Sequence, residues 1–310
     1  MFDIGTASRL SSRQLLMVNN LLLSHAHLDH LCGFDQLLRV CLHRSAPLRV
    51  GGPSGTIAKI GSRLASYTWN LLDSSPFVIE AWELEGTTIF WRAFPARYGF
   101  QPHSPPRPVC SPETLLLHPG YRIATLELDH AGLPCLAFRV DEPIGIGIDS
   151  ERLRGLGYIP GGWLNELRQA IQTGAAGSVE LVAPTAAGAQ HRVNAGWLAD
   201  RVARLSSGQS IAYLTDVAAT QENWTRLVPF LARCDCLFCE AMFLDADEPR
   251  ALSRGHLTAA QAGRLARQAG VRKLVIFHIS QRYTDRRTEV EQEAYRAFCG
   301  GKYSSRDMET

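Results

Sequence analysis

One short stretch constrains this chain more than any other: a cluster of histidines directly after an apolar segment. The apolar run at 20–23 predicts a buried strand, which leads into Ser24-His25-Ala26-His27-Leu28-Asp29-His30. Side chains two apart in an extended segment point the same way, so His25 and His27 can bind one metal ion. Asp29 and His30 fall where the apolar spacing becomes helical, so they point towards a second ion. A chance cluster in a polar loop is disfavoured, because buried ionisable groups at this density need partners. Imidazole and carboxylate ligands favour zinc, with manganese or iron as alternatives.

The composition is that of an ordinary globular protein. Of the 310 residues, 45% are hydrophobic and 20% are charged, and the net charge of +2 indicates no strong field for nucleic acid or membranes. No apolar run approaches the roughly 18 residues of a membrane span, and no signal-peptide pattern opens the chain. We therefore expect a cytoplasmic protein without membrane contact. Cys234, Cys236 and Cys239 lie in an apolar run, where reduced, buried thiols are expected and a metal cluster is the alternative.

The remaining pattern predicts a single α/β domain over residues 1–310. Residues 56–72 have helical spacing, 77–94 alternate as a β-hairpin, and 99–112 are rich in proline and serine and predict a loop. Residues 150–178 form a less apolar section. A hairpin pattern in the first part of the chain and alternating strands and helices in the last part indicate packed sheets with helices outside. The later strands are expected at 122–128, 135–140, 179–183, 211–214, 237–240 and 273–278.

Further candidate ligands follow three of these strands. Asp129-His130, Asp216 and His278 each come at a strand end, where side chains from different strands can meet. Taken alone, His130 reads as a structural residue, and Asp216 as the N-cap of a helix beginning near Thr220. Together with the histidine stretch they predict a site for two metal ions, which the two oxygens of Asp216 can bridge.

Glu240 and His256 are not obvious metal ligands. Both lie beside glycine or apolar segments, where a carboxylate–imidazole pair can transfer protons. Their sequence positions leave open whether they form such a pair.

The order of these residues resembles that of a known superfamily. The pattern His25-x-His27-x-Asp29-His30, His130, Asp216, His278 resembles the metallo-β-lactamase superfamily in its phosphodiesterase branch. More narrowly, the run from Phe277 to Tyr283 (Phe-His-Ile-Ser-Gln-Arg-Tyr) is similar to the last motif of the ribonuclease Z family, the tRNA 3′-end endonucleases. Three further segments are similar to that family: 239–243, 255–263 around His256, and 157–163 near its tRNA-gripping arm.

The resemblance implies a fold and a ligand set. The fold is an αββα four-layer sandwich with the site at one edge, usually in a homodimer. Relatives carry two or three more strands before the position where this chain starts, so its first strands are expected to be missing or atypical. Residues 150–178 correspond to a shortened arm-like insertion. One zinc ion would be bound by His25, His27 and His130, the other by Asp29, His30 and His278, and Asp216 would bridge them.

The resemblance also implies a reaction on precursor tRNA. A water or hydroxide between the ions, oriented by Asp29, attacks the phosphodiester, and His256, oriented by Glu240, protonates the leaving 3′-oxygen. Arg282 follows His278 by four residues and is a candidate for binding a substrate phosphate.

Several positions depart from the family pattern. Thr215 replaces the usual small residue before the bridging Asp, the Arg usual after that Asp is absent, and Cys239 stands where a His normally precedes the Glu. The arm-like section has no lysine. These changes leave the expected metal ligands in place, but they leave open which substrate the protein acts on. Besides a ribonuclease Z-like endonuclease, the alternatives are a dizinc hydrolase for a small phosphodiester, such as a cyclic nucleotide, or another ester, and a non-catalytic metal-binding scaffold.

Overall fold

The computed structural model describes residues 1–7, 9–110, 115–118 and 120–301. The chain divides into two compact units, and every candidate metal ligand belongs to the larger one. The expectation of one domain over 1–310, with a shortened insertion at 150–178, stays a prediction. The larger unit comprises Met1–Leu117, Ile123–Val140 and Ser210–Thr310, and the smaller unit comprises His118–Arg122 and Asp141–Gln209.

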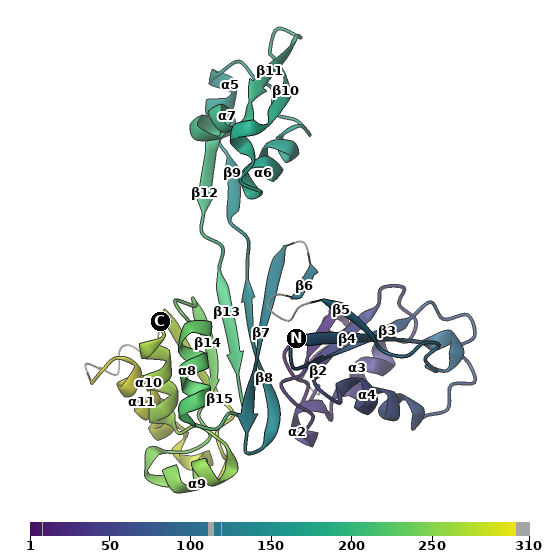
Figure 1. Ribbon diagram of the computed structural model, residues 1–310, viewed down its shortest axis with the longest axis vertical. Helices are drawn as coiled ribbons and strands as arrows, with labels where there is room; N and C mark the ends of the chain where they lie inside the picture. Colours follow the sequence, from purple (N-terminus) through teal and green to yellow (C-terminus); the bar gives the residue numbers. More distant parts are fainter. Residues whose placement is uncertain (8, 111–114, 119, 302–310) are drawn as a thin grey trace. The chain divides into compact units, whose positions relative to one another are not determined.

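The first sheet of the larger unit contains the strand that leads into the histidine stretch (Figure 1). The first three strands pair in parallel, and the fourth is antiparallel to both of its neighbours. The hairpin predicted at 77–94 is therefore confirmed. In spatial order the strands are β1 (Asn20–Leu22), β2 (Leu48–Pro53), β3 (Val78–Glu85), β4 (Thr88–Pro95) and β5 (Arg107–Cys110).

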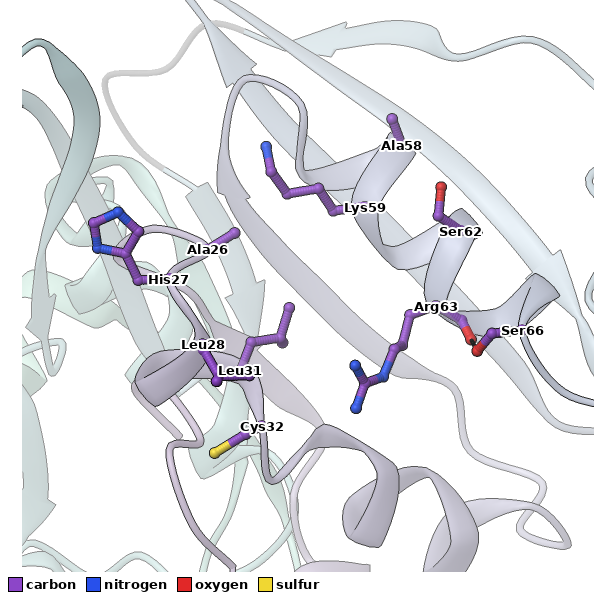
Figure 2. A pocket seen from close by; sticks show the side chains of 10 residues that line it. All are labelled: Ala26, His27, Leu28, Leu31, Cys32, Ala58, Lys59, Ser62, Arg63 and Ser66. Atoms are coloured by element: carbon purple, nitrogen blue, oxygen red, sulfur yellow. Dashed lines mark hydrogen bonds between the residues drawn. The ribbon is translucent and has the colours of Figure 1, made fainter.

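Helices pack on this sheet through regularly spaced apolar residues. In α4 (Thr56–Ala65) the buried residues Ile57, Ile60 and Leu64 form one stripe. The opposite face of α4 lines a cavity beside α2 (Figure 2). The other elements of this half are α1 (Ser12–Leu16), α2 (Leu28–Leu31), α3 (Phe34–Cys41) and the 3₁₀ helix η1 (Ala96–Tyr98).

The helix predicted over 56–72 ends earlier, at Ala65. The Ser66 hydroxyl donates to the Arg63 carbonyl at 2.6 Å, and the Trp69 indole N–H donates to the Leu64 carbonyl at 2.7 Å. These side chains satisfy carbonyl groups that a continuing helix would have bonded internally. Apolar spacing alone did not reveal this stop.

The loop predicted over 99–112 was wrong in part, because residues 107–110 form strand β5. β5 pairs with β4 at the edge of the sheet, with a register irregularity between Ile89 and Phe90. An edge position tolerates Pro108, which has no N–H to donate. Residues 111 and 112 lie outside the described part of the chain.

The second sheet carries the later candidate ligands. Three of its strands, β13, β14 and β15, are parallel neighbours, as the alternating pattern of strands and helices indicated. In spatial order the strands are β15 (Lys273–Phe277), β14 (Cys236–Glu240), β13 (Ser210–Leu214), β8 (Leu133–Asp141), β7 (Tyr121–His130) and β6 (Leu115–His118). The helices that follow β13, β14 or β15 in the chain are α8 (Gln221–Phe230), η3 (Asp245–Asp247), α9 (Glu248–Arg254), α10 (Ala259–Gln268), η4 (Gln281–Arg286) and α11 (Arg287–Phe298).

Contacts between the two sheets include aromatic rings and a backbone hydrogen bond. Phe2 stacks on Tyr213 of β13 and Phe138 of β8, with ring centroids 4.9 and 5.8 Å away. The Leu136 N–H donates to the Ser24 carbonyl at 2.8 Å. Helices α3 and α4 lie beside the first sheet, and α8, α10 and α11 beside the second (Figure 1). The predicted αββα sandwich is therefore confirmed.

The smaller unit has its own apolar core, which includes Leu153, Leu167, Leu181 and Leu198. Two antiparallel strand pairs and short helices surround this core. No helix in the described ranges is long and apolar enough to span a membrane. The elements of the smaller unit are β9 (Gly145–Ile148), α5 (Ser150–Gly155), α6 (Leu164–Gln172), η2 (Ala176–Ser178), β10 (Glu180–Pro184), β11 (Gln190–Asn194), α7 (Ala195–Val202) and β12 (Ala203–Ser206).

Candidate metal centre and active site

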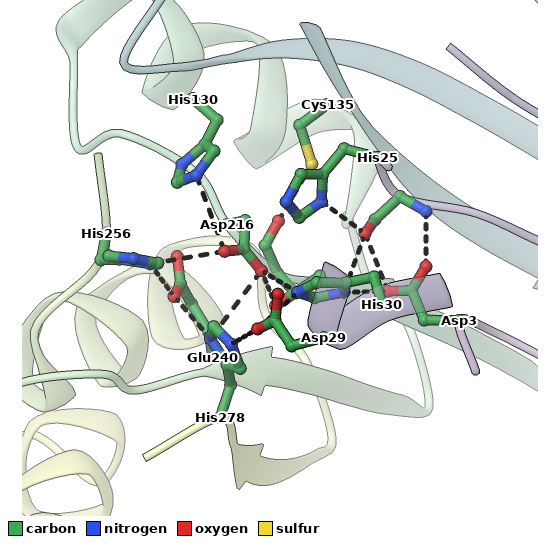
Figure 3. A network of polar contacts seen from close by, with 12 residues as sticks. Asp3, His25, Asp29, His30, His130, Cys135, Asp216, Glu240, His256 and His278 are labelled. Atoms are coloured by element: carbon green, nitrogen blue, oxygen red, sulfur yellow. Dashed lines mark hydrogen bonds and ion pairs between the residues drawn. The ribbon is translucent and has the colours of Figure 1, made fainter. Parts of the chain in front are cut away.

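The candidate ligands meet because they lie at the ends of strands from both sheets. His25 follows β1, and His130 ends β7. Asp216, Glu240 and His278 lie at the carboxyl ends of the parallel strands β13, β14 and β15, so they emerge at the same edge of the second sheet (Figure 3). The chain thus brings together side chains that are up to 253 positions apart in the sequence (His25 to His278).

Both ligand sets named from the sequence are close enough to hold a metal ion. In each set the potential ligand atoms lie within 4.8 Å of one another. Asp216 lies between the sets, with Oδ2 3.2 Å from Nε2 of His30 and Oδ1 3.7 Å from Nε2 of His130. The two sets are His25, His27 and His130, and Asp29, His30 and His278.

The orientation of the imidazoles fits metal binding. Nδ1 of His25 contacts the Ser24 hydroxyl at 3.0 Å, and Nδ1 of His130 contacts the Gly255 carbonyl at 2.9 Å. By contrast, Nε2 of His25 and Nε2 of His30 are buried and make no hydrogen bond. A buried ring nitrogen without a partner, on a ring held through its other nitrogen, is the usual arrangement of a metal-binding histidine.

The electrostatics of the cluster are also those of a cation site. Burial lowers the pKa of His25 to about 3, so its imidazole is neutral and has a free lone pair. Burial also opposes protonation of His30, but the nearby carboxylates of Asp216 and Asp3 outweigh it and raise the pKa of His30 to about 10. Burial would raise the pKa of Asp216, but His30 and His278 hold it below its ordinary value. The site therefore attracts positive charge.

The backbone is strained at this site. Asp3, Asp216 and His278 have φ angles of +45°, +52° and +54°, in the left-handed region that non-glycine residues seldom occupy. Such conformations persist where the surrounding structure enforces them, and they cluster at functional sites. Here two of the strained residues are candidate metal ligands.

Glu240 and His256, whose pairing the sequence left open, are in direct contact. Nδ1 of His256 lies 2.8 Å from Oε2 of Glu240, and Glu240 is fully buried. The other Glu240 oxygen accepts backbone N–H groups from Val217 at 2.9 Å and Leu257 at 3.3 Å. These bonds hold the carboxylate in place and make Nδ1 of His256 the donor to it, so Nε2 of His256 is the nitrogen left for other chemistry.

Asp3 is an important residue that sequence reasoning missed. Its carboxylate accepts hydrogen bonds from the Ser24 N–H and hydroxyl at 2.7 and 2.8 Å and from the Tyr213 hydroxyl at 2.9 Å, and it lies 2.8 Å from Nδ1 of His30. It therefore fixes the ring of a candidate ligand and joins the two sheets. The available signal was a carboxylate between the apolar residues Phe2 and Ile4.

Two other groups of candidates have different surroundings. Arg282, on η4, forms an ion pair with Asp247 at 3.5 Å, so its role in binding a substrate phosphate stays a prediction. Cys234 and Cys239 are buried, as expected, and are not in disulfide bonds, while Cys236 is half-buried. Within the described ranges, none of these cysteines belongs to a group that could hold a metal ion.

Comparison with known proteins gives the family. A ribonuclease Z of Deinococcus radiodurans is 32% identical over 294 residues, which cover 92% of this chain and 83% of that protein. The chain belongs to the ribonuclease Z family. A ribonuclease Z of Halalkalibacterium halodurans is 30% identical over 308 residues, covering 96% of this chain and 83% of that protein. The profile of the beta-lactamase superfamily domain matches residues 164–279.

Solved structures agree with the family at the level of the fold. A metallo-β-lactamase fold protein of Bacillus subtilis superimposes with a TM-score of 0.51 at 15% identity, covering 96% of this chain and 79% of its own. The short form of human tRNase Z gives a TM-score of 0.50 at 16% identity, covering 91% and 82%. These neighbours establish the metallo-β-lactamase fold for this member of the ribonuclease Z family.

Proposed function

We propose that this protein is a metal-dependent phosphodiesterase that cleaves precursor tRNA at its 3′ end. The observation that carries the proposal is the Glu240–His256 pair beside a cluster of seven candidate metal ligands. A metal-binding scaffold alone would not need a buried carboxylate that orients a further imidazole. Membership of the ribonuclease Z family supports precursor tRNA as the substrate.

The ligand sets support two divalent ions, with zinc favoured by their nitrogen and oxygen donors. His25, His27 and His130 would hold one ion, Asp29, His30 and His278 the other, and Asp216 would contact both. When bound, such ions polarise the phosphodiester and lower the pKa of a nearby water molecule.

Asp29 differs from the other candidate ligands in its exposure. Its side chain is 68% exposed, whereas that of Asp216 is 4% exposed. Oδ2 of Asp29 lies 3.5 Å from Nε2 of His30 and 3.7 Å from Nε2 of His278. A carboxylate that faces solvent at the edge of the cluster can accept a hydrogen bond from an incoming water molecule and so orient it towards the substrate.

His256 is suited to the opposite end of the reaction. As the water oxygen bonds to phosphorus, the bond from phosphorus to the 3′-oxygen breaks, and that oxygen needs a proton. Imidazolium at His256 would supply the proton from Nε2, with Glu240 stabilising the charge through Nδ1. The products are a tRNA with a 3′-hydroxyl and a trailer with a 5′-phosphate.

The charge of the smaller unit bears on how strongly RNA is bound. Its residues, 118–122 and 141–209, include seven Arg and no Lys against seven Asp and Glu. Phosphate contacts from cationic side chains supply most of the affinity for nucleic acids. We therefore expect weak precursor cleavage that falls steeply as salt rises. Because the positive and negative side chains of the smaller unit are equal in number, a small phosphodiester stays the second candidate substrate.

Parallel assays test the proposal. The purified protein, loaded with zinc, is incubated with a precursor tRNA carrying a 3′ trailer and with bis(p-nitrophenyl) phosphate, at several salt concentrations. We expect cleavage of both substrates and loss of both activities after chelation. Hydrolysis of the small diester with no precursor cut even at low salt would refute the tRNA assignment and favour the second candidate.

Two finer features also belong to the proposal. We expect a homodimer, which light scattering of the purified chain tests: a monomer at micromolar concentration would contradict it. We also expect a cytoplasmic location, which fractionation of the source cells tests.

A further inference from the structure

A cavity of about 600 Å³ opens beside the metal centre, within the larger unit. One wall is the segment 26–32, which includes the candidate ligand His27, and the other wall is the outward face of α4 (Figure 2). The volume lies within the range of small-molecule sites. Because His27 belongs to both places, the cavity directly adjoins the candidate metal centre.

The α4 wall follows from the two-faced sequence of that helix. Ile57, Ile60 and Leu64 are buried in the core, which turns Ala58, Lys59 and Ser62 outward. The side chains of this wall are small or cationic, and no carboxylate is among the residues that line the cavity. The wall thus combines room with positive charge.

The facing wall is apolar where a surface next to a polar site would usually be hydrophilic. Leu28 is 76% exposed, although it lies between the candidate ligands His27 and Asp29. Ala26 and Leu31 add to the same apolar lining. Together these side chains give this wall an apolar surface, and the flat face of a nucleobase is apolar enough to cover it.

The cationic group available in the cavity is Lys59. Arg63 also lines it, but its guanidinium forms two hydrogen bonds with Asp35, one of them 2.8 Å long. Lys59 has no hydrogen bond or ion pair with any residue in the described ranges. Its Nζ lies over Gly55, 2.9 Å from where a Cβ atom of that residue would stand, so the glycine leaves room for the ammonium group.

The positive charge at this wall comes from the Lys59 ammonium group and not only from the N-terminus of α4. Glu83 already accepts the Ile57 N–H at the start of α4, at 2.8 Å. An unpaired ammonium beside an apolar surface matches a phosphate with its attached base. We propose that this cavity is a subsite for the nucleotide next to the scissile phosphate, with its base on Leu28 and its phosphate on Lys59. The inference rests on the proposed function, because it takes RNA as the substrate.

Substitutions at Lys59 test the charge of the subsite. Lys59→Gln removes the charge, Lys59→Arg keeps it, and Arg39→Gln is the matched control, since Arg39 is an exposed arginine that does not line the cavity. Steady-state kinetics are measured with precursor tRNA and with bis(p-nitrophenyl) phosphate. For Lys59→Gln, we expect kcat/KM for the precursor to fall by about tenfold relative to that for the small diester, mostly through KM. The plot of log kcat/KM against the logarithm of salt concentration should become less steep by about one. Lys59→Arg should restore most of kcat/KM for the precursor and most of this slope.

A second variant tests the space without changing the charge. Ala58→Trp fills the cavity from an exposed helix position, so it does not disturb the core. We expect it to raise KM for the precursor by several-fold more than KM for the small diester. Thermal unfolding of each variant shows whether the fold is retained.

The outcomes separate this inference from the proposed function. If wild type cuts the precursor but Lys59→Gln is no weaker on it than Arg39→Gln, the subsite is wrong and the proposed function stands. Equal losses on both substrates would also overturn the subsite, since they would indicate a disturbed metal centre. If wild type leaves the precursor uncut, the proposed function fails and the subsite falls with it.

Discussion

Replacing His256 with Ala tests its role as proton donor, and the structure allows the expected loss of rate to be estimated. The imidazole contacts Glu240 at 2.8 Å and is not a member of either ligand set named from the sequence. A positioned general acid contributes about 10²- to 10⁴-fold in rate. At about 1.4 kcal/mol per factor of ten, that loss corresponds to roughly 3–5 kcal/mol of transition-state stabilisation.

The same substitution should affect stability much less. It removes one hydrogen bond to a charged carboxylate, a change of about 1.5–3 kcal/mol. Glu240 keeps its two backbone N–H donors, and Nδ1 of His278 remains 3.4 Å from Oε2, so the lower end of that range applies. At about 2–4 °C per kcal/mol, the melting temperature should fall by only a few degrees. The variant therefore stays folded at the assay temperature, and its loss of rate reports on chemistry.

The assay compares two leaving groups. The ribose 3′-oxygen of precursor tRNA leaves as a strongly basic alkoxide and needs a proton, whereas p-nitrophenolate from bis(p-nitrophenyl) phosphate needs little assistance. His256→Ala should lose the full factor on the precursor and far less on the small diester, with its metal content unchanged. His43→Ala, at an exposed histidine, is the control. Equal losses on both substrates, or loss of metal, would refute the general-acid role.

Three further outcomes follow from contacts described above. Asp216→Ala should abolish turnover and should reduce the bound metal, which elemental analysis should find at about two ions per wild-type chain. Less than one ion in wild type after metal-replete expression would contradict the two-ion site. Asp3→Asn turns an amide group towards some of the donors to that carboxylate, so the free energy of unfolding in denaturant should fall by about 2–3 kcal/mol, and an unchanged value would refute its structural role. Gly51→Ala places a Cβ atom 1.6 Å from the buried Trp82 ring, so it should destabilise by about 3 kcal/mol or more, whereas Gly162→Ala, which meets nothing within 4 Å, should not.

Much of the site could be predicted because its chemistry is concentrated in the sequence. The spacing of His25, His27, Asp29 and His30 predicted a metal site from residue types alone, and strand ends indicated His130, Asp216 and His278. The structure brings all of these side chains together. Parallel strands deliver their carboxyl ends to one edge, so a strand-end residue has a predictable position even when its partners are distant in the sequence.

Features that depend on packing between distant segments could not be predicted. Asp3 acts through Tyr213, which is 210 positions away, and no local pattern signals that hydrogen bond. The end of α4 depended on a hydrogen bond from the Trp69 side chain, which apolar periodicity does not detect. Strand β5 formed at a sheet edge although Pro108 argued for a loop. In each case tertiary contact outweighed a local preference.

The left-handed backbone conformations of Asp216 and His278 lower the stability of the fold at two residues that the proposed activity requires. A non-glycine residue in such a conformation costs about 1–3 kcal/mol, and glycine would remove most of that cost. Engineering that selects variants only for resistance to heat would therefore favour replacing the very residues that the proposed chemistry needs. A useful library would hold these two positions constant and seek its gains at exposed positions remote from the strand ends.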